Sequence, residues 1–124
     1  MPSLRTLEGK KKYQEYLKNT AASGVCSLCG KDALKVFAHW RIVDNSFPYD
    51  QIAKVHEMLV PNRHCTEPEL TEEELGELRQ IKAEFVNSNY DWILEATTKN
   101  KSVPGHFHLH LLVGKERVPE TLDE

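Results

Sequence analysis

Three histidines at every second position of one apolar segment constrain this chain more than any other feature. The segment is His106-Phe-His-Leu-His-Leu-Leu-Val113, and it holds three of the six histidines in 124 residues. Side chains of a strand alternate between its faces, so the pattern predicts a strand with three imidazoles on one face and Phe107, Leu109 and Leu111 on the other. A buried imidazole costs free energy unless it meets a hydrogen-bond partner or a metal. The segment therefore indicates a functional site, the alternative being a half-exposed strand that carries histidines by chance.

The composition fits one compact domain over residues 1–124, with a helical extension over residues 1–24. Hydrophobic residues make up 40% of the chain, which is enough for a core. The formal charge of −3 leaves no broad basic face for phosphate backbones, so a nucleic-acid partner is not expected. No apolar run reaches membrane-spanning length, and the N-terminus lacks the apolar core of a secretion signal. We therefore expect a cytoplasmic protein without membrane contact.

The hydrophobic pattern predicts helices and strands in the order helix, strand, strand, helix, strand, strand. We expect helices over residues 6–18 and 71–87, and strands over residues 36–43, 55–60, 90–95 and 106–113. The long helix begins with a capping box between Thr71 and Glu74. Its apolar stripe consists of Leu75, Leu78, Ile81 and Phe85.

Three cysteines, two of them in Cys26-Ser-Leu-Cys29, favour metal ligation over disulfide formation in a reducing compartment. Gly30 permits a tight turn directly after the second cysteine. A redox pair of thiols is the alternative interpretation, and Cys65 is interpreted as a free thiol.

The histidine segment resembles the motif His-φ-His-φ-His-φ-φ, with φ apolar, of the histidine-triad (HIT) superfamily of nucleotidyl hydrolases and transferases. Residues 106–112 satisfy every position, and His56-Glu-Met-Leu-Val-Pro-Asn-Arg-His64 is similar to a strand that precedes the long helix of that family. Asn45-Ser-Phe-Pro48 is similar to a turn in aprataxin and in the branch related to galactose-1-phosphate uridylyltransferase. The resemblance covers roughly residues 25 to 114. It implies an α+β fold, with a HIT-like antiparallel sheet, the long helix packed on one face and the N-terminal helix as an extension.

The resemblance also implies a mechanism. The middle histidine of the family triad attacks phosphorus and forms a covalent nucleotidyl-histidine, a role that falls to His108. The third, His110, would donate to the phosphate oxygens, and the first, His106, would support the orientation of the nucleophile. The implied substrate is a nucleotide or nucleoside phosphate, cleaved by hydrolysis or transfer at a phosphoanhydride or phosphoramidate bond. Smaller members commonly dimerise, so we expect a homodimer that covers the apolar face near Trp92.

Contacts to the nucleotide are expected from two places. In the family an acidic residue at the end of the first strand commonly holds the ribose, which points to Asp44, with Asn45 beside it. Many members hold the phosphate with Gly-Gln-Ser/Thr-Val shortly before the triad, whereas this chain has Lys101-Ser-Val-Pro-Gly105. Ser102 and Asn100 are the candidates for that contact, and both also fit an ordinary polar loop.

A subset of bacterial histidine-triad proteins pairs an N-terminal Cys-x-x-Cys with two histidines around a structural metal. By this resemblance Cys26, Cys29, His64 and His106 form a closed set of four ligands, which suits structural Zn²⁺. The remaining histidines, His39 and His56, are interpreted as structural.

Two other classes of protein stay open. A zinc treble-clef module of the HNH-nuclease kind binds nucleic acid and also begins with Cys-x-x-Cys-Gly, but it needs a His-His or Asp-His pair where Ala38-His39-Trp40 offers one histidine. A nucleotide-binding protein without turnover would keep the fold and lose the nucleophile, whereas His108 is present.

Overall fold

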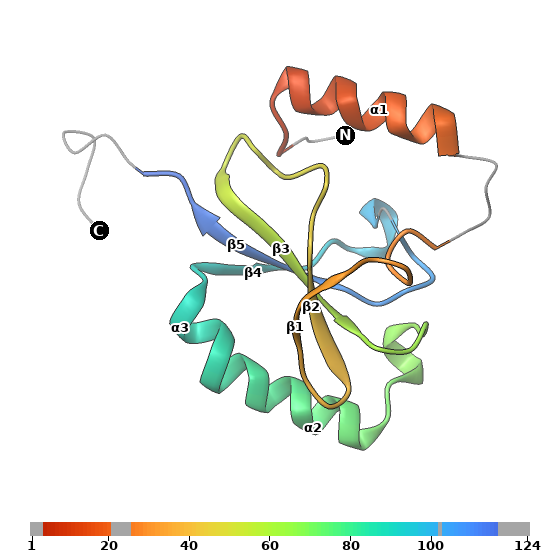
Figure 1. The fold of residues 1–124 in the computed structure, drawn as a ribbon, viewed down its shortest axis with the longest axis vertical. Helices are drawn as coiled ribbons and strands as arrows, with labels where there is room; N and C mark the ends of the chain where they lie inside the picture. Colours follow the sequence, from red (N-terminus) through yellow and green to blue (C-terminus); the bar gives the residue numbers. More distant parts are fainter. Residues whose placement is uncertain (1–3, 21–25, 102, 117–124) are drawn as a thin grey trace.

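A five-stranded sheet organises the computed structural model, which describes residues 4–20, 26–101 and 103–116. The strand order is β1-β2-β3-β5-β4, and every neighbouring pair is antiparallel (Figure 1). The strands are β1 (Ala33–Val36), β2 (Trp40–Asp44), β3 (Ala53–Pro61), β4 (Trp92–Leu94) and β5 (Leu109–Gly114). This arrangement confirms the predicted α+β class and its antiparallel sheet.

Helices lie on both sides of this sheet (Figure 1). On one side α2 (Glu72–Ile81) continues through a π-helical turn (Lys82–Val86) into α3 (Asn87–Asn89), and together they form the predicted long helix. On the other side lies α1 (Leu7–Thr20), the predicted N-terminal helix. Short 3₁₀ turns cover Glu67–Glu69 and Thr98–Asn100. In the described ranges, none of the helices has the length and apolar character needed to span a membrane.

Two predicted strands differ from the observed ones. The predicted strand over residues 36–43 is divided into β1 and β2 by a reversal in which the Phe37 amide donates to the Trp40 carbonyl at 2.7 Å. The predicted strand over residues 106–113 pairs with β3 only from Leu109 onward. Before that point the Phe107 amide donates to the Cys65 carbonyl, which lies beyond the end of β3. As a result His106 and His108 precede β5, and only His110 lies within it.

The main core lies between the sheet and α2. It joins Leu109 and Leu111 of β5 to Trp40, Ile42 and Leu59 from β2 and β3 and to Leu78 and Ile81 from α2. Phe107 belongs to the same cluster. The core therefore contains the three apolar residues that alternate with the triad histidines, as predicted.

The predicted apolar stripe of α2 is wrong at Leu75, which stays 36% exposed, whereas Glu74 is buried. Glu74 tolerates burial because its carboxylate meets Arg63 at 2.9 Å and accepts the Thr71 amide at 2.8 Å. The Arg63 bond, and after it the Thr71 bonds, lower the pKa of Glu74 to about 2. The predicted capping box is thereby confirmed, with an ion pair added from the chain segment before it.

Candidate functional site

Three imidazoles gather on the sheet face opposite α2. His56 of β3 lies two residues before Met58, which pairs with His110 of β5, so both histidines point to the same face. Their ring nitrogens, His56 Nε2 and His110 Nδ1, are 2.7 Å apart. The ring of His108 lies 5.1 Å from that of His110, and all three side chains are buried. The structure thus brings two of the predicted triad residues together and adds His56, which we had interpreted as structural.

Hydrogen bonds around His56 determine which nitrogen of each ring carries the proton. The Tyr49 amide donates to His56 Nδ1 at 2.9 Å, so a neutral His56 carries its proton on Nε2. That proton is donated to His110 Nδ1 across the 2.7 Å contact. His110 therefore carries its own proton on Nε2, which makes this nitrogen a hydrogen-bond donor.

His108 is the opposite tautomer to His110: its proton is on Nδ1 and not on Nε2. Its Nδ1 lies 2.9 Å from the carbonyl oxygen of His106 and donates to it, since a carbonyl can only accept. Nε2 of a neutral His108 therefore keeps its lone pair. The resemblance assigned to His106 the support of the nucleophile's orientation. The main-chain carbonyl of His106 makes this contact, whereas the His106 ring belongs to a second cluster.

Burial keeps these imidazoles neutral near pH 7. Burial is the largest cause, and together with the positive charge of neighbouring groups, Arg5 among them, it lowers the pKa of His56 to about 4 and that of His110 to about 3. The pKa of His108 is also lowered, mainly by burial. A neutral imidazole is the form that can attack phosphorus or donate a single N–H bond.

A second cluster contains the four predicted metal ligands. One ligand atom from each of Cys26, Cys29, His64 and His106 lies within 4.8 Å of the others. Nδ1 of His106 is 3.5 Å from Cys26 Sγ and 3.4 Å from Cys29 Sγ, and Nδ1 of His64 is 3.2 Å from Cys29 Sγ. Tetrahedral Zn²⁺, with Zn–S of about 2.3 Å and Zn–N of about 2.0 Å, separates sulfur and nitrogen ligands by about 3.5 Å. The four residues therefore lie close enough to hold a metal ion and are compatible with zinc.

Arg41 and Pro61 fix this cluster on the sheet. The His106 ring places Nε2 3.1 Å from the Pro61 carbonyl and donates to it, which leaves the lone pair of Nδ1 facing the two sulfurs. Arg41 donates to the same carbonyl at 3.3 Å and to the Leu28 carbonyl, inside the cysteine turn, at 2.7 Å. One guanidinium thus ties the cysteine turn to the strand that orients His106, a role that the sequence analysis missed.

The predicted ribose contacts lie on different faces of the sheet. Asp44 is exposed at the end of β2 and pairs in register with Glu57, whose carboxylate contacts Tyr90 on the α2 side. Alternation therefore places Asp44 on the face opposite the imidazoles. Asn45 lies on their face, because its amide donates to the His56 carbonyl at 3.1 Å and its Nδ2 is 3.3 Å from His56 Nε2.

The predicted phosphate contacts lie in the loop between β4 and β5. Asn100 ends the 3₁₀ turn Thr98–Asn100 and is exposed, with its amide donating to the Thr97 carbonyl. Ser102 lies outside the described residues.

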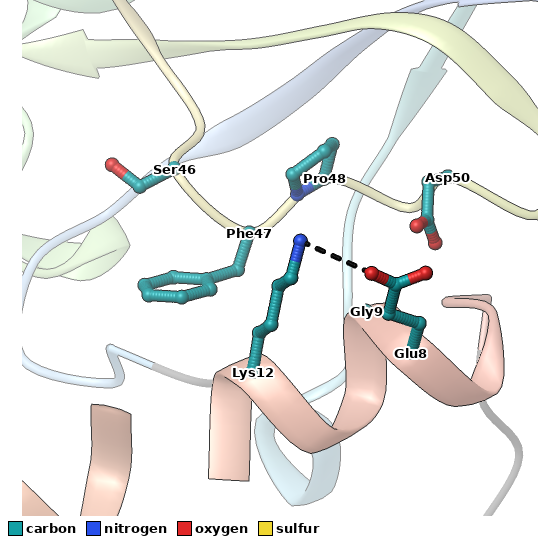
Figure 2. A pocket seen from close by; sticks show the side chains of 7 residues that line it. All are labelled: Glu8, Gly9, Lys12, Ser46, Phe47, Pro48 and Asp50. Carbon is teal, nitrogen blue, oxygen red and sulfur yellow. Dashed lines mark ion pairs between the residues drawn. The ribbon is translucent and has the colours of Figure 1, made fainter. Parts of the chain in front are cut away.

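The turn that carries Tyr49 is held by α1. Tyr16 and Tyr13 pack on Phe47 with ring centroids 4.7 and 5.5 Å away. The Thr6 amide and hydroxyl donate to Asp50 at 2.7 and 2.8 Å. A hollow of about 230 Å³ lies between α1 and this turn. Its lining residues are Glu8, Gly9, Lys12, Ser46, Phe47, Pro48 and Asp50 (Figure 2). None of the triad histidines lines it, so the hollow is separate from the imidazole site.

His56 and Tyr49 are the residues of the imidazole site that sequence reasoning missed. The position of His56 at the head of the segment similar to the family strand was the available signal, because alternation along an adjacent strand places it on the triad face. Tyr49 gave no signal, since its place depends on how the turn after β2 folds back over β3.

The sequence matches no family model and no curated protein. Solved structures are similar in fold. One, described as a Hit-like protein, has a TM-score of 0.51 and 18% identity over 82% of this chain and 98% of its own. Another, a histidine triad protein from Clostridium difficile, has a TM-score of 0.50 and 14% identity over 83% of this chain and 92% of its own. The chain therefore has the fold of the histidine-triad superfamily.

Proposed function

We propose that the protein is a nucleotide hydrolase or nucleotidyltransferase whose nucleophile is His108. The observation that carries the proposal is the complementary state of two neighbouring rings: Nε2 of His108 has a lone pair and Nε2 of His110 has a proton. One can attack a phosphorus atom while the other donates to its oxygens. The fold likeness supports a nucleotide as the substrate class.

The reaction would proceed in two displacements. In the first, the Nε2 lone pair of His108 forms a bond to phosphorus, and the bond to the leaving group breaks with its electron pair, so that the leaving group takes a proton from solvent. The ring then carries positive charge, which the Nδ1–H bond to the His106 carbonyl stabilises. In the second, water attacks phosphorus and releases a proton, and the electron pair of the N–P bond returns to Nε2. Another acceptor in place of water makes the reaction a transfer.

The nucleotide contacts remain part of the proposal. Asn45 is the best supported of them, since its amide group already touches His56 on the imidazole face. Asp44 would reach a ribose only around the end of β2. Asn100 and Ser102 would contact the substrate from the loop before the triad.

We also propose that Cys26, Cys29, His64 and His106 bind one structural Zn²⁺. Four protein ligands leave no open position for substrate, as in structural zinc sites. When bound, the ion would link the cysteine turn to the segments before α2 and β5, and it would keep His106 in place behind the nucleophile. Reduced thiols of this kind fit a cytoplasmic location, which we propose together with a homodimer.

Incubation of the purified chain with adenosine and uridine 5′-phosphoramidates tests the function. We expect release of the nucleoside monophosphate without added Mg²⁺, because the nucleophile is an imidazole. Nucleotide binding without product would favour the non-catalytic alternative. Cleavage of DNA that requires Mg²⁺, without phosphoramidate turnover, would favour the zinc-nuclease alternative.

A further inference from the structure

Tyr49 lies against two imidazoles of the candidate site. Its ring centroid is 4.4 Å from that of His56 and 5.0 Å from that of His110. Its hydroxyl oxygen is 3.4 Å from His110 Nε2, the nitrogen that carries the donor proton. The Tyr49 side chain is half-buried.

We propose that the Tyr49 hydroxyl is a second hydrogen-bond donor to the substrate phosphate and acts beside His110. The inference rests on the proposed function and names a phosphate-binding residue within it. An oxygen placed about 2.8 Å from both donors would accept from both, because the two atoms are only 3.4 Å apart. Two donors that converge on one oxygen form the arrangement that stabilises charge developing on a phosphoryl group.

The proton of the phenol is available for this role. His110 Nε2 carries a proton and therefore cannot accept one from the phenol, so the Tyr49 hydroxyl proton stays free to be donated to a substrate oxygen. Burial raises the pKa of Tyr49 above its ordinary value, which keeps the hydroxyl protonated near neutral pH. Tyr49 is thus a donor under the same conditions that keep the imidazoles neutral.

Arg5 adds positive charge behind the same ring. Its guanidinium carbon lies 5.0 Å from the Tyr49 centroid and 4.1 Å from that of Tyr13, and its Nε donates to the Phe47 carbonyl at 2.8 Å. The charge reaches the imidazoles, since it lowers the pKa of His56 and His110. An anionic phosphate at His110 would feel the same charge as an attraction.

This assignment also bears on the segment before the triad, where the sequence departs from the family motif. The chain has Lys101-Ser-Val-Pro-Gly105 where many histidine-triad proteins have Gly-Gln-Ser/Thr-Val to hold the phosphate. Tyr49 supplies a hydroxyl from the turn after β2, and therefore from a different part of the chain. Arg5 and α1 hold that turn through their contacts with Phe47.

Tyr49→Phe tests the hydroxyl alone. The variant keeps the ring, and it keeps the main-chain amide that donates to His56 Nδ1, so the tautomers of His56 and His110 are preserved. Tyr13→Phe is the matched control, because the Tyr13 ring also contacts Arg5 and the substitution removes the same atom. Both variants should melt within a few degrees of the wild type.

With a nucleoside 5′-phosphoramidate that the wild type cleaves, Tyr49→Phe should lower kcat about tenfold to a hundredfold and change KM about threefold or less. Tyr13→Phe should keep wild-type constants. The wild type should also distinguish the two phosphorothioate diastereomers of the substrate, and this ratio should shrink in Tyr49→Phe, which a merely structural role would not cause. A kcat within twofold of wild type, or an unchanged diastereomer ratio, overturns the inference.

If the wild type cleaves no phosphoramidate, the proposed function fails. The contact between the Tyr49 hydroxyl and a phosphate is then tested by nucleotide binding. The four ribonucleoside 5′-monophosphates are then titrated calorimetrically into wild type and variants. Binding at least about threefold weaker in Tyr49→Phe than in Tyr13→Phe supports the contact. Equal binding by both variants, or no binding by the wild type, overturns it.

Discussion

The carbonyl oxygen of His106 accepts a hydrogen bond from Nδ1 of His108 at 2.9 Å, while the ring of the same His106 lies 3.4 Å from Cys29 Sγ. One residue thus touches the candidate nucleophile with its main chain and the candidate metal cluster with its side chain. The chemistry of the first cluster therefore depends on the geometry of the second.

Replacing His108 with Ala should abolish turnover and leave nucleotide affinity within a few-fold of wild type. A nucleophile contributes chiefly to the covalent step, so its loss appears in kcat. Single-turnover kinetics and equilibrium binding measure the two effects separately. His39→Gln is the control, since His39 is not among the clustered histidines. Its hydrogen bond to Glu77 comes from the main-chain N–H, which the substitution keeps. A His108→Ala variant with wild-type kcat would remove His108 from the mechanism.

Loss of the metal should loosen the fold and the site together. We expect one zinc per chain by native mass spectrometry in the wild type and little in Cys26→Ser. That variant should melt about 10 °C or more below wild type, because a ligand bound only by the native state adds to its stability. Its turnover should fall as the His106 carbonyl shifts behind His108.

Ser27→Ala, an exposed change inside the same cysteine turn, should leave zinc content and melting temperature unchanged. A wild-type protein that is purified without chelator, contains no zinc and is nevertheless stable and active would leave Cys26 and Cys29 as ordinary thiols.

Much of this arrangement was accessible from the sequence, because it follows from local periodicity. The two-residue repeat placed Phe107, Leu109 and Leu111 in the core, and Thr71 with Glu74 defined the start of α2. Where the prediction was wrong, a distant partner decides the outcome. Glu74 is buried in place of Leu75 because Arg63, eleven residues away, pairs with it.

The nucleotide side of the site was harder to predict for the same reason. Whether Asp44 or Asn45 faces the imidazoles depends on the β2–β3 register, in which Asp44 pairs with Glu57. One residue of slip would exchange the two faces. The contact of Tyr49 with His110 depends on a long turn without a periodic signature and on the packing of α1 against that turn, which its own pattern does not reveal.

Acid should destabilise the fold through the buried imidazoles. In the unfolded chain His56 and His110 take up protons near pH 6.5, whereas in the folded chain they do so only near pH 4 and pH 3. Below pH 6.5 the unfolded state therefore binds more protons, and the free energy of unfolding falls as the pH falls, by on the order of 6 kcal/mol by pH 4 for two groups that titrate independently. Above pH 6.5 this effect is absent.

Urea unfolding between pH 7 and pH 4 measures this slope, and His110→Gln should flatten it because one of the two groups is gone. Proton NMR of the imidazole Cε1–H signals assigns the midpoints to single residues. Midpoints near the ordinary histidine value for both His56 and His110 in the folded protein would contradict the prediction.

The exposed edge of the sheet should form a homodimer. Trp92 and Ile93 of β4, an outer strand, are 50% and 39% exposed on opposite faces of the sheet, which leaves apolar side chains on both sides of an open sheet edge. Sedimentation equilibrium should give twice the chain mass of 14.3 kDa at micromolar concentration. Ile93→Lys should yield monomers, because a charged side chain at this edge opposes its burial.

Leu34→Lys is the control. It changes an equally apolar side chain, 58% exposed, on the other outer strand, β1, and should leave the dimer intact. A wild type that sediments as a single 14.3 kDa species would show that β4 stays open in solution, and dissociation by Leu34→Lys alone would move the interface to β1.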